Sequence, residues 1–195
     1  KYLSVSETAY EDIPEDAAEK LVASLLDFFH DRLKVQLKDS GIRHDVISAV
    51  IADGDDDLVR IVARAKALQE FLQAENGVNL LAAYKRAANI VAIEEKKDNI
   101  SGQRSVVSGQ LKEKEEIELA SLLEVAANEL KSLNYKEKFT EAMNKLASLR
   151  QPLDLFFEKI MVNCEDKTLR IARLNLLAQV RDTMDSIADF SKIEG

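Results

Sequence analysis

The chain has 195 residues, of which 46% are hydrophobic, so it can bury the core of one large domain or two small ones. Two prolines, six glycines and only 6% aromatic residues exclude a turn-rich β-sandwich or barrel and indicate an all-α protein. The formal net charge of -8 argues against a general nucleic-acid coat protein, because binding to phosphates depends mainly on lysine and arginine.

Apolar residues recur at three- and four-residue spacing along the chain, which predicts a bundle of about seven to eight helices. The first spans about 15–39 and is expected to end at Gly41, because glycine readily adopts the left-handed conformation that stops a helix. A short helix follows near 46–51, and the acidic turn 53–57 after it can cap a third helix. Asn76 and Gly77 are predicted to separate this third helix from a fourth at about 79–97.

Residues 98–110 contain glycines and serines without helical periodicity, which predicts the longest loop of the chain. We expect a single helical domain over 1–195, or two helical halves, 1–97 and 111–195, joined by this loop. Further helices are predicted near 119–133 and 139–149. Another is expected to start at Pro152, and a last one, capped by Asp166, runs to about 187.

The sequence lacks the patterns that catalysis usually requires. The six glycines are scattered rather than clustered before a helix, so no nucleotide-binding loop is present. The acidic run from Asp53 has neither the glycine nor the glutamate that a calcium loop needs at its sixth and twelfth positions. His30, His44 and Cys164 stand far apart, which leaves no zinc site and no nucleophile with a base. We therefore expect no catalytic residue, metal or cofactor in this chain.

A single cysteine cannot form an internal disulfide, and this favours a reducing compartment. No apolar run approaches the roughly 20 residues that cross a bilayer, and the first residues do not form a basic and then apolar leader. We expect a cytoplasmic protein without a membrane partner. Because the sequence begins with lysine, we also expect it to be a piece of a longer chain.

The basic residues gather in the middle of the chain. Residues 79–114 carry seven cations and four carboxylates, whereas every other segment has a net negative charge. Here Tyr84, Lys85, Arg86 and Asn89 lie within two helical turns, and the last two share a face at i, i+3 spacing. These two could hold a phosphate or a base edge together. The alternative is a surface arginine beside an asparagine that bonds to another helix.

Three segments share a pattern with a known family. Residues 155–163 follow FF-x-K-V-M-V, and residues 166–177, with Arg170 and Arg173, follow an acidic break and then L-R-x-x-R-L-x-L-L. Residues 84–90 follow N-K-R-x-x-N-I, with Tyr84 in place of asparagine. In these segments the chain resembles the C-terminal region of the bacterial glycyl-tRNA synthetase beta subunit, and the similarity spans about residues 20–193.

The resemblance implies a helical anticodon-binding domain, of the class Ia-like type also found in arginyl-tRNA synthetase and named after an Asp-Ala-Leu-Arg signature. Residues 166–170 depart from that signature by a threonine and one extra residue, so Asp166 is predicted to cap a helix rather than to recognise RNA. The implied enzyme is an alpha/beta heterotetramer that joins glycine to its tRNA with ATP. Its aminoacylation site belongs to the alpha subunit, so this fragment alone is expected to be non-catalytic.

The resemblance implies two partners, the alpha subunit and the tRNA that carries glycine. DNA is not expected to bind. The alternative is a helical docking module that contacts protein without RNA. One concave basic strip from the fourth to the last helix would support RNA, and scattered cations would support docking. The residues expected to contact the RNA backbone are Lys85, Arg86, Arg104, Arg170 and Arg173. Those expected to form hydrogen bonds to bases or to stack on them are Asn89 and Tyr84.

Overall fold

The computed structural model describes residues 17–52, 54–98 and 110–194. Within these ranges the chain is helical and has no strand, so the all-α prediction is confirmed. The helices run in the order α1 Ala17–Asp39, α2 His44–Val50, α3 Leu58–Gln73, α4 Glu75–Asp98, α5 Lys114–Tyr135, α6 Phe139–Ala147, α7 Arg150–Lys159 and α8 Lys167–Asp185, with a short 3-10 helix, η3, at Phe190–Lys192.

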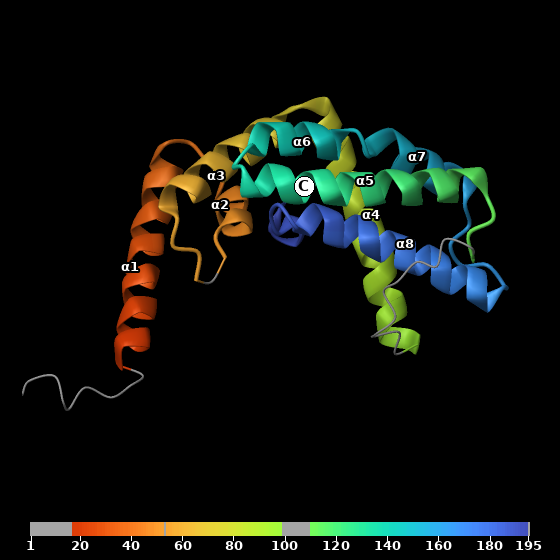
Figure 1. Ribbon diagram of the computed structural model, residues 1–195, viewed down its shortest axis with the longest axis horizontal. Helices are drawn as coiled ribbons and strands as arrows, with labels where there is room; N and C mark the ends of the chain where they lie inside the picture. The colour runs from red at the N-terminus through yellow and green to blue at the C-terminus, as the bar shows by residue number, and fades with distance from the viewer. Residues whose placement is uncertain (1–16, 53, 99–109, 195) are drawn as a thin grey trace, which may run out of the picture.

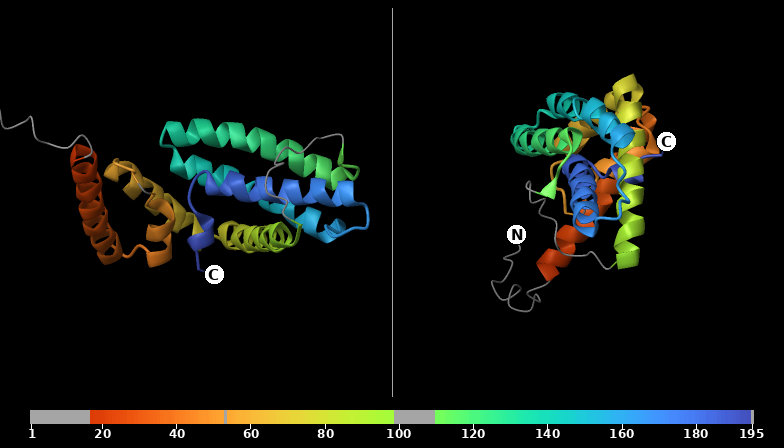
Figure 2. Two further views of the ribbon diagram at one scale, coloured as in Figure 1. Left: turned by 90° about the horizontal axis from the view of Figure 1, so that it is seen from below. Right: turned by 90° about the vertical axis from the view of Figure 1, so that its right-hand side faces the viewer.

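The bundle is built around α8, which packs against α4 and α5. Figure 1 shows α5, α6, α7 and α8 extending in similar directions, with α4 crossing them, while α1 stands apart at one end. Figure 2 shows the same separation of α1 from below. Helices from before and after residues 99–109 pack together, α3 on α6 and α4 on α7 and α8, and they share one hydrophobic core.

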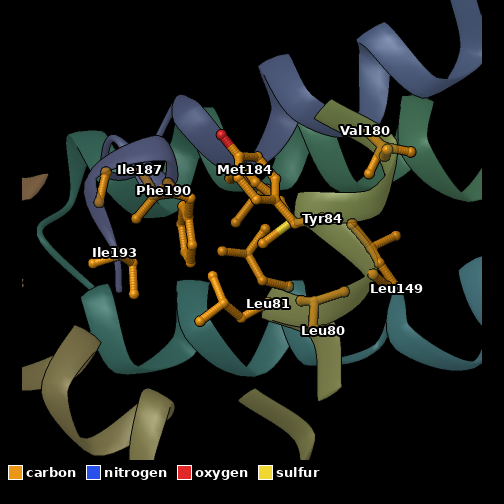
Figure 3. Close-up of a cluster of buried hydrophobic side chains, with 14 of the residues drawn as sticks. Leu80, Leu81, Tyr84, Leu149, Val180, Met184, Ile187, Phe190 and Ile193 are labelled. Carbon is orange, nitrogen blue, oxygen red and sulfur yellow. The ribbon is translucent and has the colours of Figure 1, made fainter. Parts of the chain in front are cut away.

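Tyr84 occupies the centre of the contact between α4 and α8. Its side chain is 1% exposed, and Figure 3 shows it among apolar side chains of α4, α8 and the C-terminal segment. The ring lies 5.7 Å from that of Phe190 between centroids, and the hydroxyl donates a 2.9 Å hydrogen bond to Asp185 at the end of α8. Burial and, to a smaller extent, this hydrogen bond raise the pKa of Tyr84, so the phenol stays protonated and keeps its O–H donor.

Several predicted helix ends are confirmed. Gly41 follows α1 with a φ of 87°, in the left-handed region that glycine adopts without strain. Asp57 accepts a hydrogen bond from the backbone N–H of Arg60 and caps α3. Asp166 accepts from the N–H groups of Thr168 and Leu169 and caps α8, as its acidic break predicts.

The predicted break at Asn76 and Gly77 is wrong by a few residues. Helix α3 ends at Gln73 and α4 begins at Glu75, so both residues lie in the first turn of α4. Gly77 is needed there for close packing: a Cβ atom would lie 1.8 Å from the carbonyl oxygen of Phe71. Gly77 therefore marks the tight junction between two helices rather than a loop. Pro152 likewise lies in the first turn of α7, which begins two residues earlier.

We expect Gly77→Ala to destabilise the fold by about 1–3 kcal/mol, because the new methyl group forces α3 and α4 apart. Thermal unfolding followed by circular dichroism measures the change. Val78→Ala, at an exposed neighbouring position, is the control and is expected to have little effect. Equal melting temperatures for Gly77→Ala and the parent protein would contradict the close contact.

Asp45 ties α2 to the C-terminal segment. It is buried, receives hydrogen bonds from the Arg43 side chain and from the backbone N–H of Val46, and accepts a 2.8 Å bond from the N–H of Glu194. Burial alone would raise the pKa of Asp45, but these hydrogen bonds outweigh it and the pKa is lowered. The ionised carboxylate is therefore the form that holds the end of the chain in place.

Because the pKa of Asp45 is lower in the folded chain, its contribution to stability is complete above the ordinary value of 3.8 and is lost as pH falls through the folded value. We expect Asp45→Asn to be less stable than the parent by about 1–3 kcal/mol at neutral pH. The difference in melting temperature is expected to shrink as the pH is lowered below 3.8. A difference that grows on acidification would contradict this assignment. Asp31→Asn, on the exposed surface of α1, is the control for a carboxylate outside the core.

Candidate nucleic-acid interface

The four candidate residues of α4 lie on different faces of the helix. Tyr84, Ala87 and Val91 recur at helical spacing and are buried, so they form the inward face. Arg86 and Asn89 are exposed, as expected for a pair at i, i+3 on the opposite side. The structure therefore places these two residues together on the surface.

Lys85 and Tyr84 occupy different positions from that outward pair. Lys85 is partly buried at the edge of the outward face of α4. Tyr84 points into the core and has no ring face available for stacking on a base. Its predicted role as a base contact therefore conflicts with its position, since the hydroxyl and the ring are both used in packing against α8 and η3.

Phe157 on α7 holds Arg86 in a defined position. The guanidinium carbon lies 4.2 Å from the centroid of the Phe157 ring, within the range of a cation–π interaction. Phe157 is itself anchored by an edge contact with Phe156, which is fully buried. The planar guanidinium thus lies over a ring that the core supports, and its N–H edges remain available to a ligand.

A recess of about 450 Å³ lies between α4 and α7, beside this pair. Arg150 also lines it and donates a 2.9 Å hydrogen bond to the side chain of Asn76. Two carboxylates, Asp154 and Glu158, lie on the α7 side and limit the positive charge. The complete lining is Asn79, Ala82, Ala83, Arg86, Arg150, Asp154, Phe157 and Glu158.

The arginines of α8 serve the packing of the bundle. Arg173 is buried, forms an ion pair with the fully buried Glu116 of α5, and donates a 2.8 Å bond to the carbonyl oxygen of Met161. Glu116 also accepts hydrogen bonds from the backbone N–H groups of Lys112 and Glu113, which completes the N-terminal cap of α5. Arg173 is thus only 6% exposed, with its Nε and Nη1 groups bonded to protein, which conflicts with its predicted contact to RNA.

Arg170 and Arg181 link α8 to α4 through neighbouring carboxylates. Arg170 pairs with Glu94, and Arg181 lies 3.5 Å from Glu95. The hydrogen bond from Arg170 and, to a smaller extent, one from Lys97 lower the pKa of Glu94, so its carboxylate remains charged. Within the described residues, these pairs place a carboxylate beside each of the two cations where the helices cross, so Arg170 and Arg181 serve the contact between α4 and α8.

The seven predicted contact residues therefore fall into three groups. Lys85, Arg86 and Asn89 lie on the outward side of α4, whereas Tyr84, Arg170 and Arg173 belong to the packing between helices. Arg104, together with nearly all of the predicted loop 98–110, lies outside the described residues. Sequence reasoning missed Phe157, whose only signal is the adjacent aromatic pair at 156–157 in a helix otherwise read as core.

The described part of the chain holds neither a metal site nor a membrane-spanning helix. Among residues 17–52, 54–98 and 110–194, no three His, Cys, Asp or Glu side chains come together as a metal site. Within those ranges, no helix is long and apolar enough to cross a membrane. His30 is buried, and its Nε2 lies 2.6 Å from the backbone oxygen of Asp55, so it has a structural partner.

Residues 80–194 match the DALR anticodon binding domain family, and this match runs from the second turn of α4 through η3, more than half of the chain. The chain belongs to this family. The resemblance inferred from the residues of α4 and α8 is thereby confirmed, and both segments lie inside the matched region. Helices α1, α2 and α3 lie before it.

Curated relatives extend the similarity over nearly the whole sequence. The chain is 50% identical over 185 residues to the glycine–tRNA ligase beta subunit of Rhodospirillum centenum, a match that covers 94% of this chain and 26% of the relative. It is 48% identical over 172 residues to that of Phenylobacterium zucineum, covering 88% and 25%. The subunit of a Ruegeria species is 46% identical over 176 residues, covering 89% and 25%. The chain thus spans about a quarter of the length of these relatives.

We expect Arg173→Ala to lower the free energy of unfolding by about 3–5 kcal/mol, because it leaves the Glu116 carboxylate buried without its partner. Arg86→Ala is expected to cost less than about 1 kcal/mol, since it removes only an exposed cation–π contact. Denaturant unfolding of the two variants measures the contrast. Similar losses for both substitutions would show that the surface and core positions have been assigned wrongly.

Proposed function

We propose that this chain is the tRNA-binding module of a glycine–tRNA ligase beta subunit, and that the outward side of α4 contacts the anticodon end of the tRNA. This contact site is inferred mainly from the position of Arg86, which is exposed, lies 4.2 Å from the ring centroid of Phe157 and lines a recess. A guanidinium fixed in this way forms hydrogen bonds to phosphate oxygens with little further loss of side-chain freedom. The match to an anticodon-binding family supports the same assignment.

The three residues on the outward side of α4 have distinct roles in this proposal. Arg86 and Lys85 contact phosphates, because cations provide the sequence-independent part of RNA binding. Asn89, one turn from Arg86 on the same face, offers an amide that can both donate to and accept from a base edge. Phe157 and the recess add an apolar surface beside them. This small basic site on an acidic protein favours a local contact with folded RNA over coating of a long strand.

The module positions the tRNA, while the reaction takes place elsewhere in the assembly. We propose that the full beta subunit acts with an alpha subunit in an alpha/beta heterotetramer in the cytoplasm, joining glycine to its tRNA at the expense of ATP. Contacts far from the reacting ester then hold the acceptor end in a productive orientation. The chain itself contributes binding and orientation and needs no cofactor for either.

We expect Arg86→Ala to weaken tRNA binding by a similar factor for any anticodon sequence, and to lower the slope of log affinity against log salt by about one. Arg86→Lys is expected to keep the slope but bind more weakly, because an ammonium lacks the forked set of N–H donors that a guanidinium offers to phosphate oxygens. Titration of the full ligase with tRNA at several salt concentrations measures both.

Lys38→Ala provides a matched control, because it removes an exposed cation from α1, which stands apart from α4 at one end of the molecule (Figure 1). Its affinity and salt slope are expected to equal those of the parent protein. If Arg86→Ala and Asn89→Ala also leave both quantities unchanged, α4 does not contact the tRNA and the docking alternative is favoured.

A further inference from the structure

Helix α1 carries an apolar surface that the described part of the molecule leaves uncovered. Five large side chains of its first half form this surface, which we name the α1 stripe, and they are between 46% and 61% exposed: Leu21, Val22, Leu25, Phe28 and Phe29. Leu21, Leu25, Phe28 and Phe29 follow the i, i+4, i+7, i+8 spacing of one helix face, so the five side chains form a continuous patch.

The contacts of α1 explain why the stripe stays exposed. The buried residues of α1 are His30, Leu33 and Leu37, all in its second half, where the helix packs against α2 and α3. The first half projects away from the bundle in Figures 1 and 2. A recess of about 490 Å³ runs beside it, with walls that include Val22, Leu26 and Gly54.

Isolated apolar side chains on a protein surface are common, but a continuous patch with helical spacing marks an interaction site. Val59 of α3, 78% exposed, is of the first kind, because no other large apolar side chain of that helix is exposed. The α1 stripe is of the second kind. Two adjacent phenylalanines in edge contact enlarge it further, with ring centroids 5.8 Å apart.

The occupant follows from the length of chain outside this structure. The relatives are about four times as long as the matched region, so three quarters of such a subunit lies elsewhere. Helix α1 precedes the segment 80–194 that matches the anticodon-binding family, whose own helices close a common core. A surface on the same polypeptide is present at an effective concentration in the millimolar range, far above that of a separate protein.

We propose that the α1 stripe docks into an apolar face in the remaining part of the beta-subunit polypeptide and fixes the anticodon-binding helices relative to it. The partner face is uncharged at its centre, because burying a charge against leucine and phenylalanine without a counter-charge is strongly unfavourable. The proposal rests on membership in a longer beta-subunit chain. It does not require that α4 contacts RNA.

Photo-crosslinking in the full-length beta subunit tests the docking directly. Phe28 is replaced by p-benzoylphenylalanine, and the irradiated subunit is digested and mapped by mass spectrometry, without tRNA and without the alpha subunit. We expect adducts to residues of the same polypeptide outside 1–195, in a species that migrates as a monomer on a denaturing gel. The same probe at Tyr135, 89% exposed at the end of α5, is the control and is expected to give no such adduct.

Other outcomes of this experiment overturn the proposal. An adduct within residues 1–195 means that the chain covers its own stripe, and a crosslinked dimer means that a second copy does so. An absence of adducts in the beta subunit, or adducts that form only after the alpha subunit is added, also excludes docking within the polypeptide. Because tRNA is absent throughout, a failure here is independent of the contact proposed for α4.

Hydrogen exchange in the full subunit provides a second measurement. The double variant Leu25→Ser with Phe28→Ser is expected to raise the exchange rates of α1 amides 18–29 at least tenfold and to leave α5 and α8 unchanged. Val59→Ser, which also removes an exposed apolar side chain, is the control and is expected to leave the exchange rates of α1, α5 and α8 unchanged. Unchanged protection of α1 in the double variant would overturn the proposal, because the stripe would then not be the contact surface.

Discussion

Tyr84 joins α4 to α8, and its burial determines which side chains of α4 are exposed to solvent. The phenol contributes a ring to the core and a hydrogen bond to Asp185, so α4 cannot rotate without leaving a buried polar group unpaired. With Tyr84 fixed inward, the helical repeat directs Arg86 and Asn89 to the surface, where Arg86 lies over Phe157 of α7. The packing of Tyr84 in the core thus determines which residues of α4 are available to contact RNA.

Ion pairs between α8 and its neighbouring helices have a different role. Arg173 with Glu116, and Arg170 with Glu94, connect α8 to α5 and α4, and in each pair the carboxylate is buried. Removing one partner of such a pair leaves an uncompensated charge, so these residues are constrained by the fold. The same amino-acid type therefore supports the structure on α8 and presents a charge to solvent on α4.

The two surfaces proposed to make contacts lie on different helices and differ in chemistry. The outward side of α4 is polar and small, which suits a local contact with phosphates and base edges. The α1 stripe is apolar and continuous, which suits a permanent contact within a longer polypeptide. An anticodon-binding module needs both properties: it must hold RNA reversibly, and it must itself be held at a fixed distance from the site of the reaction.

The sequence by itself determined the helices, most of their ends and the family, because helical periodicity, caps such as Asp166 and the motif around Arg86 are local properties of the chain. It placed the boundary at Gly77 wrongly, because the need for glycine there comes from the nearby carbonyl of Phe71. Only the tertiary structure separated Arg86 from Arg173. Both are arginines on helices with similar spacing, and only packing decides whether a guanidinium meets a buried carboxylate or an exposed aromatic ring.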